Sequence, residues 1–179
     1  MFLQQGGLPP ETAVGPIKFA NVAGYSEGIV FDSAGAAYVS LLHLGQVVRW
    51  RKDGVPEPWA AIEEPNGHRI LPDGRHLIAA KGGVYRFSAA GRLLDTLASH
   101  NGPDRLRNPN DLAVDGAGGV YFTDPGPDDD PVARGGKVYY ARDGMPLRLV
   151  ATGFCYPNGL LVRADGRVLL PFRRLYVIA

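Results

Sequence analysis

Four oxygen-bearing side chains stand at matching positions along the chain and could together hold a cation. They are Glu27, Asn66, Asn110 and Asn158, which lie 39 to 48 residues apart. One carboxylate and several amide oxygens pointing at a common centre would suit Ca²⁺ or Mg²⁺ and would disfavour zinc or copper. Pro-Asn-Gly and Pro-Asn-Asp are also ordinary turn sequences, so the recurrence at one repeat position is what favours metal binding.

Each of these four residues begins a repeat of the same design. A short apolar run leads to a turn with Asp and Gly, and a second run rich in β-branched or aromatic residues follows, which is the pattern of an antiparallel hairpin. We expect the turn aspartates to serve the turns through local hydrogen bonds and to carry no chemistry. These residues are Asp32, Asp73, Asp115 and Asp165.

The repeat predicts an all-β fold, a β-propeller of four-stranded antiparallel blades. Two more candidate strands follow each of the first three hairpins, at 46–51 and 57–62 in the first repeat, and the period suits a propeller blade. Helical patterns are nearly absent, and 24 Gly with 15 Pro punctuate the chain, as a β meander requires. We expect a single domain over 1–179, with repeats starting near 27, 66, 110 and 158 and about three and a half blades.

The order of strands in a blade predicts where the side chains meet. The first strand of a blade is innermost, so the residues that begin successive repeats should converge on one axis. The second strand runs back antiparallel, which should bring Asp124 near Asn110 at the mouth of the channel. Asp124 could orient substrate or water there, or it could serve the turn before Pro125. His68 could line the channel, although a histidine packed in the core is the simpler interpretation.

Composition and charge argue against several classes of function. With 19 basic and 18 acidic residues, the net charge of +1 gives no electrostatic footprint for nucleic acid. No apolar run approaches the length of a membrane span and no secretory signal is evident, so we expect a cytoplasmic protein. The single cysteine, Cys155, fits a reducing compartment. No motif offers a covalent nucleophile, and we expect Asp128–Asp130 to be a solvated loop.

A combination of motifs resembles a known family. From about Glu27 to Leu170 the chain is similar to the gluconolactonase/regucalcin (senescence marker protein) family, whose members are six-bladed propellers. The resemblance implies that the chain is the N-terminal half, or somewhat more, of such a propeller. The motifs that carry it are Glu27-Gly28, Asn108-Pro109-Asn110-Asp111, Tyr121-Phe122-Thr123-Asp124-Pro125 and Tyr156-Pro157-Asn158-Gly159.

The resemblance implies a calcium-dependent hydrolase that acts on sugar lactones or related small-molecule lactones. The cofactor would be Ca²⁺ or another divalent cation such as Mg²⁺, Mn²⁺ or Zn²⁺. Glu27 and Asn158 match two protein ligands of the family's axial ion, and Asn110 matches a residue that contacts the metal or the substrate. Asn66 matches a channel position, and we expect it to contact substrate together with Asn110 and Asp124. The family's catalytic aspartate, also a metal ligand, would follow Ala179.

Three alternatives stay open on the sequence. A non-catalytic propeller that binds a protein or small molecule would carry aromatic and charged residues on loop tips rather than oxygen donors on the axis. A strictosidine-synthase-like propeller would perform metal-free chemistry, so metal dependence separates it from a lactonase. A truncated, inactive product would expose unpaired strand edges and could associate with itself.

Overall fold

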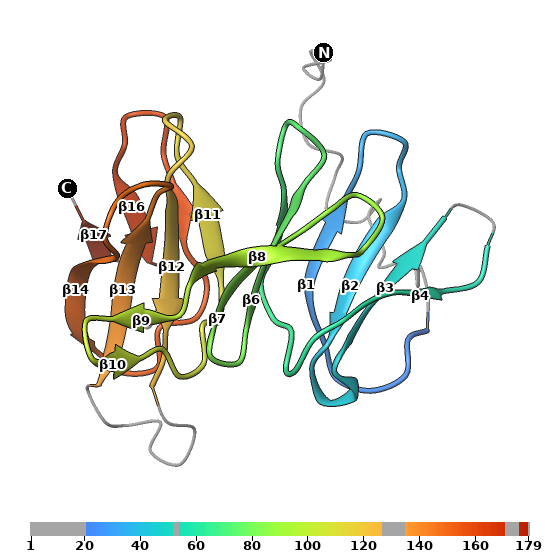
Figure 1. Ribbon diagram of the computed structural model, residues 1–179, viewed down its shortest axis with the longest axis horizontal. Coiled ribbons are helices and arrows are strands. Elements are labelled where there is room, and N and C mark those ends of the chain that lie inside the picture. Colours follow the sequence, from blue (N-terminus) through green and yellow to red (C-terminus); the bar gives the residue numbers. More distant parts are fainter. Residues whose placement is uncertain (1–20, 52–53, 127–134, 171–175, 179) are drawn as a thin grey trace, which may run out of the picture.

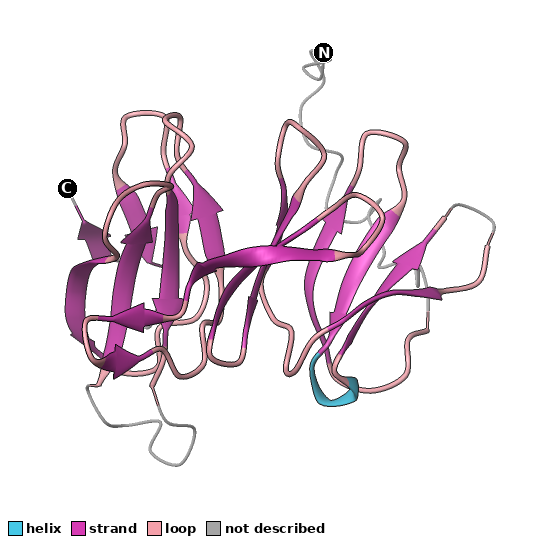
Figure 2. Ribbon diagram, viewed as in Figure 1, coloured by secondary structure: helices cyan, strands magenta, loops and turns pink. Residues whose placement is uncertain are grey.

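Strands make up nearly all of the regular structure. The computed structural model describes residues 21–51, 54–126, 135–170 and 176–178, so the acidic stretch Asp128–Asp130 lies outside the described residues. Within the described residues one short 3-10 helix, Leu42–Leu44, interrupts the strands (Figure 2). No described helix is long and apolar enough to cross a membrane.

Four antiparallel sheets, which we call blades 1 to 4, follow one another along the chain (Figure 1). Blade 1 contains β1 (Ser26–Phe31), β2 (Ala37–Leu41), β3 (Gln46–Trp50) and β4 (Glu57–Ala61). Blade 2 contains β5 (His68–Ile70), β6 (His76–Ala80), β7 (Gly83–Phe87) and β8 (Leu93–Ala98). Blade 3 contains β11 (Leu112–Val114), β12 (Val120–Asp124), β13 (Gly136–Ala141) and β14 (Arg148–Phe154). Blade 4 has three described strands, β15 (Leu161–Val162), β16 (Val168–Leu170) and β17 (Tyr176–Ile178).

In every blade each strand pairs with the next one in sequence, so each blade is a meander. A small hairpin of β9 (His100–Asn101) and β10 (Asp104–Arg105) joins blade 2 to blade 3. The predicted all-β fold of four-stranded antiparallel blades is confirmed for blades 1 to 3. The first strands of the blades contact one another in the order β1, β5, β11 and β15, which places them along the inside of the arc of blades.

The hairpin turns close through the aspartates that the repeat pattern singled out. Asp32 Oδ1 accepts hydrogen bonds from the backbone N–H groups of Ala34 and Ala36, both at 2.9 Å. Asp115 Oδ1 accepts the corresponding bonds from Ala117 and Gly119, both at 2.8 Å. Such local bonds replace ladder bonds at a turn, so each hairpin is fixed by residues within a few positions of its tip.

The core lies between neighbouring blades because alternate residues of a strand point to opposite faces of its sheet. On β6, Leu77 and Ala79 join the cluster between blades 2 and 3, while Ile78 and Ala80 join the cluster between blades 1 and 2. All four side chains are almost fully buried. Because β6 is covered on both faces, its sequence over residues 77–80 is a continuous apolar run. This packing stacks the blades and brings their first strands together.

Candidate functional site

The four side chains singled out by their spacing line one cavity of about 130 Å³ at the inner ends of the blades. The same four residues also line a second cavity, of about 190 Å³, on their other side. They therefore lie between two spaces, and we call them the axial donors. They are Glu27, Asn66, Asn110 and Asn158.

Chain direction explains the two spaces. The first cavity is lined in addition by residues that precede the axial donors, such as Tyr25, Glu64 and Tyr156. The second is lined by residues that follow them, such as Ile29 and Asp111. In each repeat the chain therefore runs past the first cavity, reaches its axial donor, and continues past the second cavity into the first strand of the blade. We call the first cavity the mouth.

Asn66 and Asn110 are each fixed by a backbone hydrogen bond to the second strand of their own blade. The N–H of Asn66 donates to the carbonyl of Ala79 at 2.8 Å, and the N–H of Asn110 donates to the carbonyl of Thr123 at 2.9 Å. These bonds extend the antiparallel ladder one step beyond β5 and β11. The side chains are thereby carried on the ends of sheets rather than on free loops.

Bonds between blades fix the donors relative to one another. The N–H of Gly67 donates to the carbonyl of Asn110 at 2.7 Å, which ties blade 2 to blade 3. The buried hydroxyl of Thr123 donates to the carbonyl of Asn158 at 2.7 Å, which ties blade 3 to the segment before blade 4.

Asp111 adds a second link of this kind. Its Oδ2 accepts a hydrogen bond from the N–H of Leu160 at 3.1 Å, and its Oδ1 lies 3.3 Å from Nη2 of Arg69. One carboxylate thus connects blades 2, 3 and 4 directly beside the axial donor Asn110. Sequence reasoning did not single out Asp111 or Thr123, although both belong to the family-like motifs, because their partners lie in other blades.

A glycine after the first axial donor allows blades 1 and 2 to approach closely. Gly28 has a φ of 46°, and a Cβ at this position would lie 1.9 Å from the carbonyl oxygen of Asn66. It falls where the pairing of β1 with β2 shifts register, between Glu27 and Val30. A side chain at residue 28 would therefore push the axial donors Glu27 and Asn66 apart.

The donor set fits a hard divalent cation. Asn110 is 6% exposed, and its Oδ1 is buried without a hydrogen-bond partner. A buried carbonyl oxygen without a donor costs free energy, and it is a suitable ligand for a calcium ion. Among the described residues there is no cluster of three or more His, Cys, Asp and Glu side chains that could hold a metal, so a cation here would rely on amide oxygens beside Glu27.

The surroundings of Glu27 disfavour its charged form in the absence of a cation. Burial raises the pKa of its carboxyl above the ordinary value, a hydrogen bond with Tyr25 lowers it, and the nearby Asp111 carboxylate raises it again. A cation beside Glu27 would favour the charged form.

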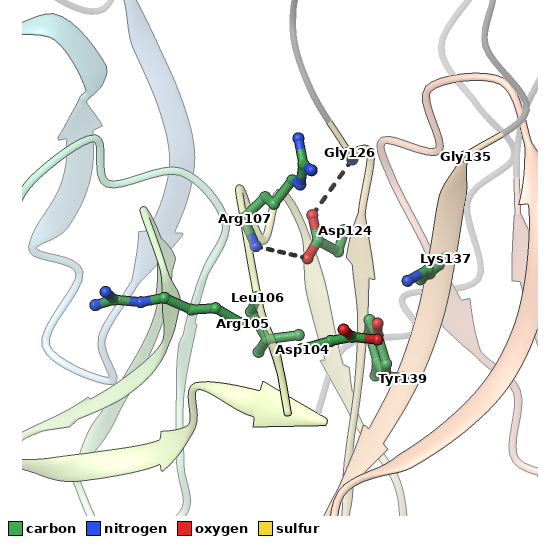
Figure 3. Close-up of a pocket in the computed structure, with 9 residues that line it drawn as sticks. All are labelled: Asp104, Arg105, Leu106, Arg107, Asp124, Gly126, Gly135, Lys137 and Tyr139. Atoms are coloured by element: carbon green, nitrogen blue, oxygen red, sulfur yellow. Dashed lines mark hydrogen bonds between the residues drawn. The ribbon is translucent and has the colours of Figure 1, made fainter. Parts of the chain in front are cut away.

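Asp124 does not line either axial cavity. Figure 3 shows it in another cavity, with its carboxylate bonded to Arg107 and Gly126. It lines a larger cavity of about 590 Å³ between the 104–107 segment and the strands β12 and β13. Its carboxylate accepts hydrogen bonds from the N–H groups of Arg107, Asn108 and Gly126, at 3.0, 3.1 and 3.3 Å. These bonds hold the segment that leads to Asn110, so Asp124 positions this axial donor through the backbone.

His68 is buried in an aromatic cluster between blades 1 and 2 and does not line either axial cavity. Its Nε2 lies 2.8 Å from Nδ1 of His76, and both rings pack against Trp59. Its Nδ1 is buried without a partner. The simpler interpretation of this residue, a histidine packed in the core, is the one that the structure supports.

Comparisons with known proteins agree with this geometry. Residues 25–172 match the family model described as the SMP-30/Gluconolactonase/LRE-like region. A gluconolactonase of Zymomonas mobilis is 30% identical over 122 residues, which cover 62% of this chain and 34% of that protein. The structure of a gluconolactonase from Xanthomonas campestris matches with a TM-score of 0.71 and 28% identity, covering 83% of this chain and 54% of that one.

A calcium-binding protein, regucalcin, from Agrobacterium tumefaciens matches with a TM-score of 0.70 at 19% identity, covering 85% of this chain and 52% of that one. At this identity the likeness concerns the fold alone. The chain spans about half the length of these solved structures and 34% of the Zymomonas protein. Its sheets therefore correspond to about half of a six-bladed propeller.

Proposed function

Because the chain belongs to the SMP-30/gluconolactonase/LRE-like family, we propose that its axial donors form part of the site of a calcium-dependent hydrolase of sugar lactones or related lactones. The observation that carries the proposal is the convergence of Glu27, Asn66, Asn110 and Asn158 on one cavity, with the buried Oδ1 of Asn110 left without a partner. The relative from Xanthomonas campestris, described as a gluconolactonase, supports the substrate class.

Three of the axial donors would hold the cation. Glu27 supplies the negative charge, and Asn110 and Asn158 supply neutral oxygens, a combination that calcium tolerates. When bound, a divalent cation at this place acts as a Lewis acid that polarises a lactone carbonyl. Asn66 lines both cavities next to the other donors, and it would contact the substrate.

The supporting residues hold these groups still. Thr123 holds the carbonyl of Asn158 and Asp111 holds the N–H of Leu160, two residues later, while the Asp124 carboxylate fixes the segment before Asn110. Preorganised oxygens avoid the cost of ordering them when the ligand binds. For residues 1–179 the proposal concerns the binding of cation and lactone.

Thermal unfolding with excess calcium and then with chelator tests the proposal. A ligand that binds only the folded state stabilises it by RT ln(1 + [L]/Kd), so calcium at about 100 times its Kd should raise the Tm by about 5 to 10 °C. Glu27→Gln should abolish the rise. Glu63→Gln, which removes an exposed carboxylate outside both axial cavities, should keep it. A folded chain whose Tm ignores calcium would count against the metal site.

A further inference from the structure

A second ring of side chains lies at the mouth, two residues before each axial donor. Its members all line the mouth cavity. In three of the four repeats a proline separates this residue from the donor, and proline fixes the backbone between them because its φ is locked. We call these side chains the mouth ring. They are Tyr25, Glu64, Asn108 and Tyr156.

Two members of the mouth ring have an unfavourable backbone conformation. Glu64 has a φ of 48° and Tyr156 a φ of 47°, and they are the two non-glycine residues with positive φ in the described part of the chain. The left-handed region disfavours residues with a Cβ, and a following proline restricts the backbone further. Glycine would adopt this conformation at lower cost. Strain of this kind clusters at ligand sites, so the side chains at these two positions are the feature to explain.

The Glu64 carboxylate is held in place but keeps free acceptor capacity. Nζ of Lys81 donates to Oε1 of Glu64 at 3.0 Å and to Oε1 of Glu63 at 2.7 Å. A carboxylate offers about four lone-pair positions, and this ion pair uses one on Glu64. Glu63 is more exposed, at 70% of its side chain against 34% for Glu64, and it does not line the mouth cavity.

We propose that Glu64 determines substrate specificity by accepting hydrogen bonds from the hydroxyl groups of a polyhydroxylated lactone held at the axial donors. The inference rests on the proposed function and adds to it the residue that reads the substrate. Asn108 and Tyr156 line the same mouth, so an amide and an aromatic ring stand near Glu64. Carboxylate and amide acceptors beside an aromatic ring suit a ring-shaped ligand with hydroxyls on its edge and C–H groups on its face. An apolar lactone would cover the remaining acceptor positions of Glu64 without donating to them, which lowers the affinity of that lactone.

Binding of two stable lactams, measured by titration calorimetry with saturating calcium, tests the inference. Gluconolactam carries the hydroxyls of the sugar lactone, whereas δ-valerolactam has the same ring without them. The wild-type chain should prefer gluconolactam. Glu64→Gln should lose about tenfold in affinity for gluconolactam with little change for δ-valerolactam, because the hydrogen bonds from hydroxyls to a charged acceptor are weakened. Glu63→Gln, which also removes a partner of Lys81, should bind both lactams like the wild type.

Glu64→Gly separates recognition from a merely structural role. Glycine relieves the positive φ, so its Tm should equal or exceed that of the wild type while the preference for gluconolactam is lost. If wild type, Glu64→Gln and Glu64→Gly all bind gluconolactam equally, the role of Glu64 is refuted and the proposed function survives. If the wild type binds calcium but neither lactam, the inference fails together with the lactone part of the proposed function.

Discussion

At the scale of single residues, two buried polar groups of blade 3 differ in their hydrogen bonding. The carboxylate of Asp124 accepts three backbone hydrogen bonds, whereas Oδ1 of Asn110 accepts none. A satisfied buried carboxylate stabilises the local fold, and an unsatisfied amide oxygen is available to a ligand. This difference separates residues that position the site from residues that could bind in it.

Both residues could be picked out from the sequence, but their roles could not be separated there. The Pro-Asn-Asp and Tyr-Phe-Thr-Asp-Pro motifs predict Asn110 and Asp124 together at the mouth of the channel. The pairing of β11 with β12 brings the two segments side by side, but Asp124 does not line either axial cavity. Which way Asp124 turns depends on backbone donors in the 107–108 segment, and a pattern of residue types does not reveal them. The mouth ring also occupies a repeat position in the sequence, but the residue types there gave no reason to single it out. The positive φ angles of Glu64 and Tyr156 supply that reason.

The buried histidine pair should make stability depend on pH. Burial lowers the pKa of His68 to about 3 and that of His76 to about 4. His76 and then Arg69 lower the pKa of His68 further, and Asp32 raises that of His76. Tyr38 packs against both rings. Both folded-state pKa values lie below the unfolded value, so the stability that the neutral pair contributes is present above about pH 6.5 and is lost as the pH falls towards the folded pKa values.

The expected loss is about 2 kcal/mol of unfolding free energy for each histidine between pH 7.5 and pH 5. Urea unfolding at the two pH values measures it. His43→Gln, which changes an exposed histidine outside the pair, should leave the loss unchanged. A stability that stays constant over this range would show that the pair accepts protons in the folded protein.

At the scale of the strands and turns, hairpins were easier to predict than the contacts between them. Each hairpin carries its own signal, since an aspartate at the turn bonds to the N–H two residues on, and Asp32 and Asp115 bond also to the N–H four residues on. The approach of one blade to the next has no such local signal. Gly28 is an example, because its neighbour in space, Asn66, belongs to another repeat.

Two glycines with positive φ allow the cost of backbone strain to be separated from the cost of pushing blades 1 and 2 apart. Gly28 and Gly35 have φ values of 46° and 83°, but a Cβ would meet the Asn66 carbonyl at residue 28 and nothing within 4 Å at residue 35. Gly35→Ala should therefore lose about 1 kcal/mol of stability from backbone strain alone, and Gly28→Ala about 3 kcal/mol or more because blades 1 and 2 must also separate. Chemical denaturation of the two variants measures the difference, and equal losses would contradict the close approach of these blades.

At the scale of the whole molecule, the packing rule is that each blade covers a face of the next. Clusters of buried side chains fill the spaces between blades 1 and 2, 2 and 3, and 3 and 4. On the outer face of blade 1, Ile29 and Phe31 are each 57% exposed, and Leu161 of β15 is 56% exposed. Apolar residues on sheet faces of this kind are where a further sheet would pack.

The bonds that join the axial donors have a consequence for the order of events in folding. The turn bonds of Asp32 span two and four residues. By contrast, Thr123 and Asn158 are 35 residues apart and Asp111 and Leu160 are 49 apart. Contacts of long sequence separation form late because closing the longer loop costs more entropy. We therefore expect the hairpins to be in place before the axis is assembled.

A ligand that binds only the late-formed axis should act mainly on one rate. Calcium should slow unfolding by about the full factor by which it stabilises the protein and leave the refolding rate almost unchanged, because the transition state lacks the assembled site. Stopped-flow kinetics with calcium and with chelator measure both rates, and faster refolding in calcium would place the site in the folding nucleus instead. If calcium slows unfolding alone, the axis determines how long the protein remains folded rather than how quickly it folds.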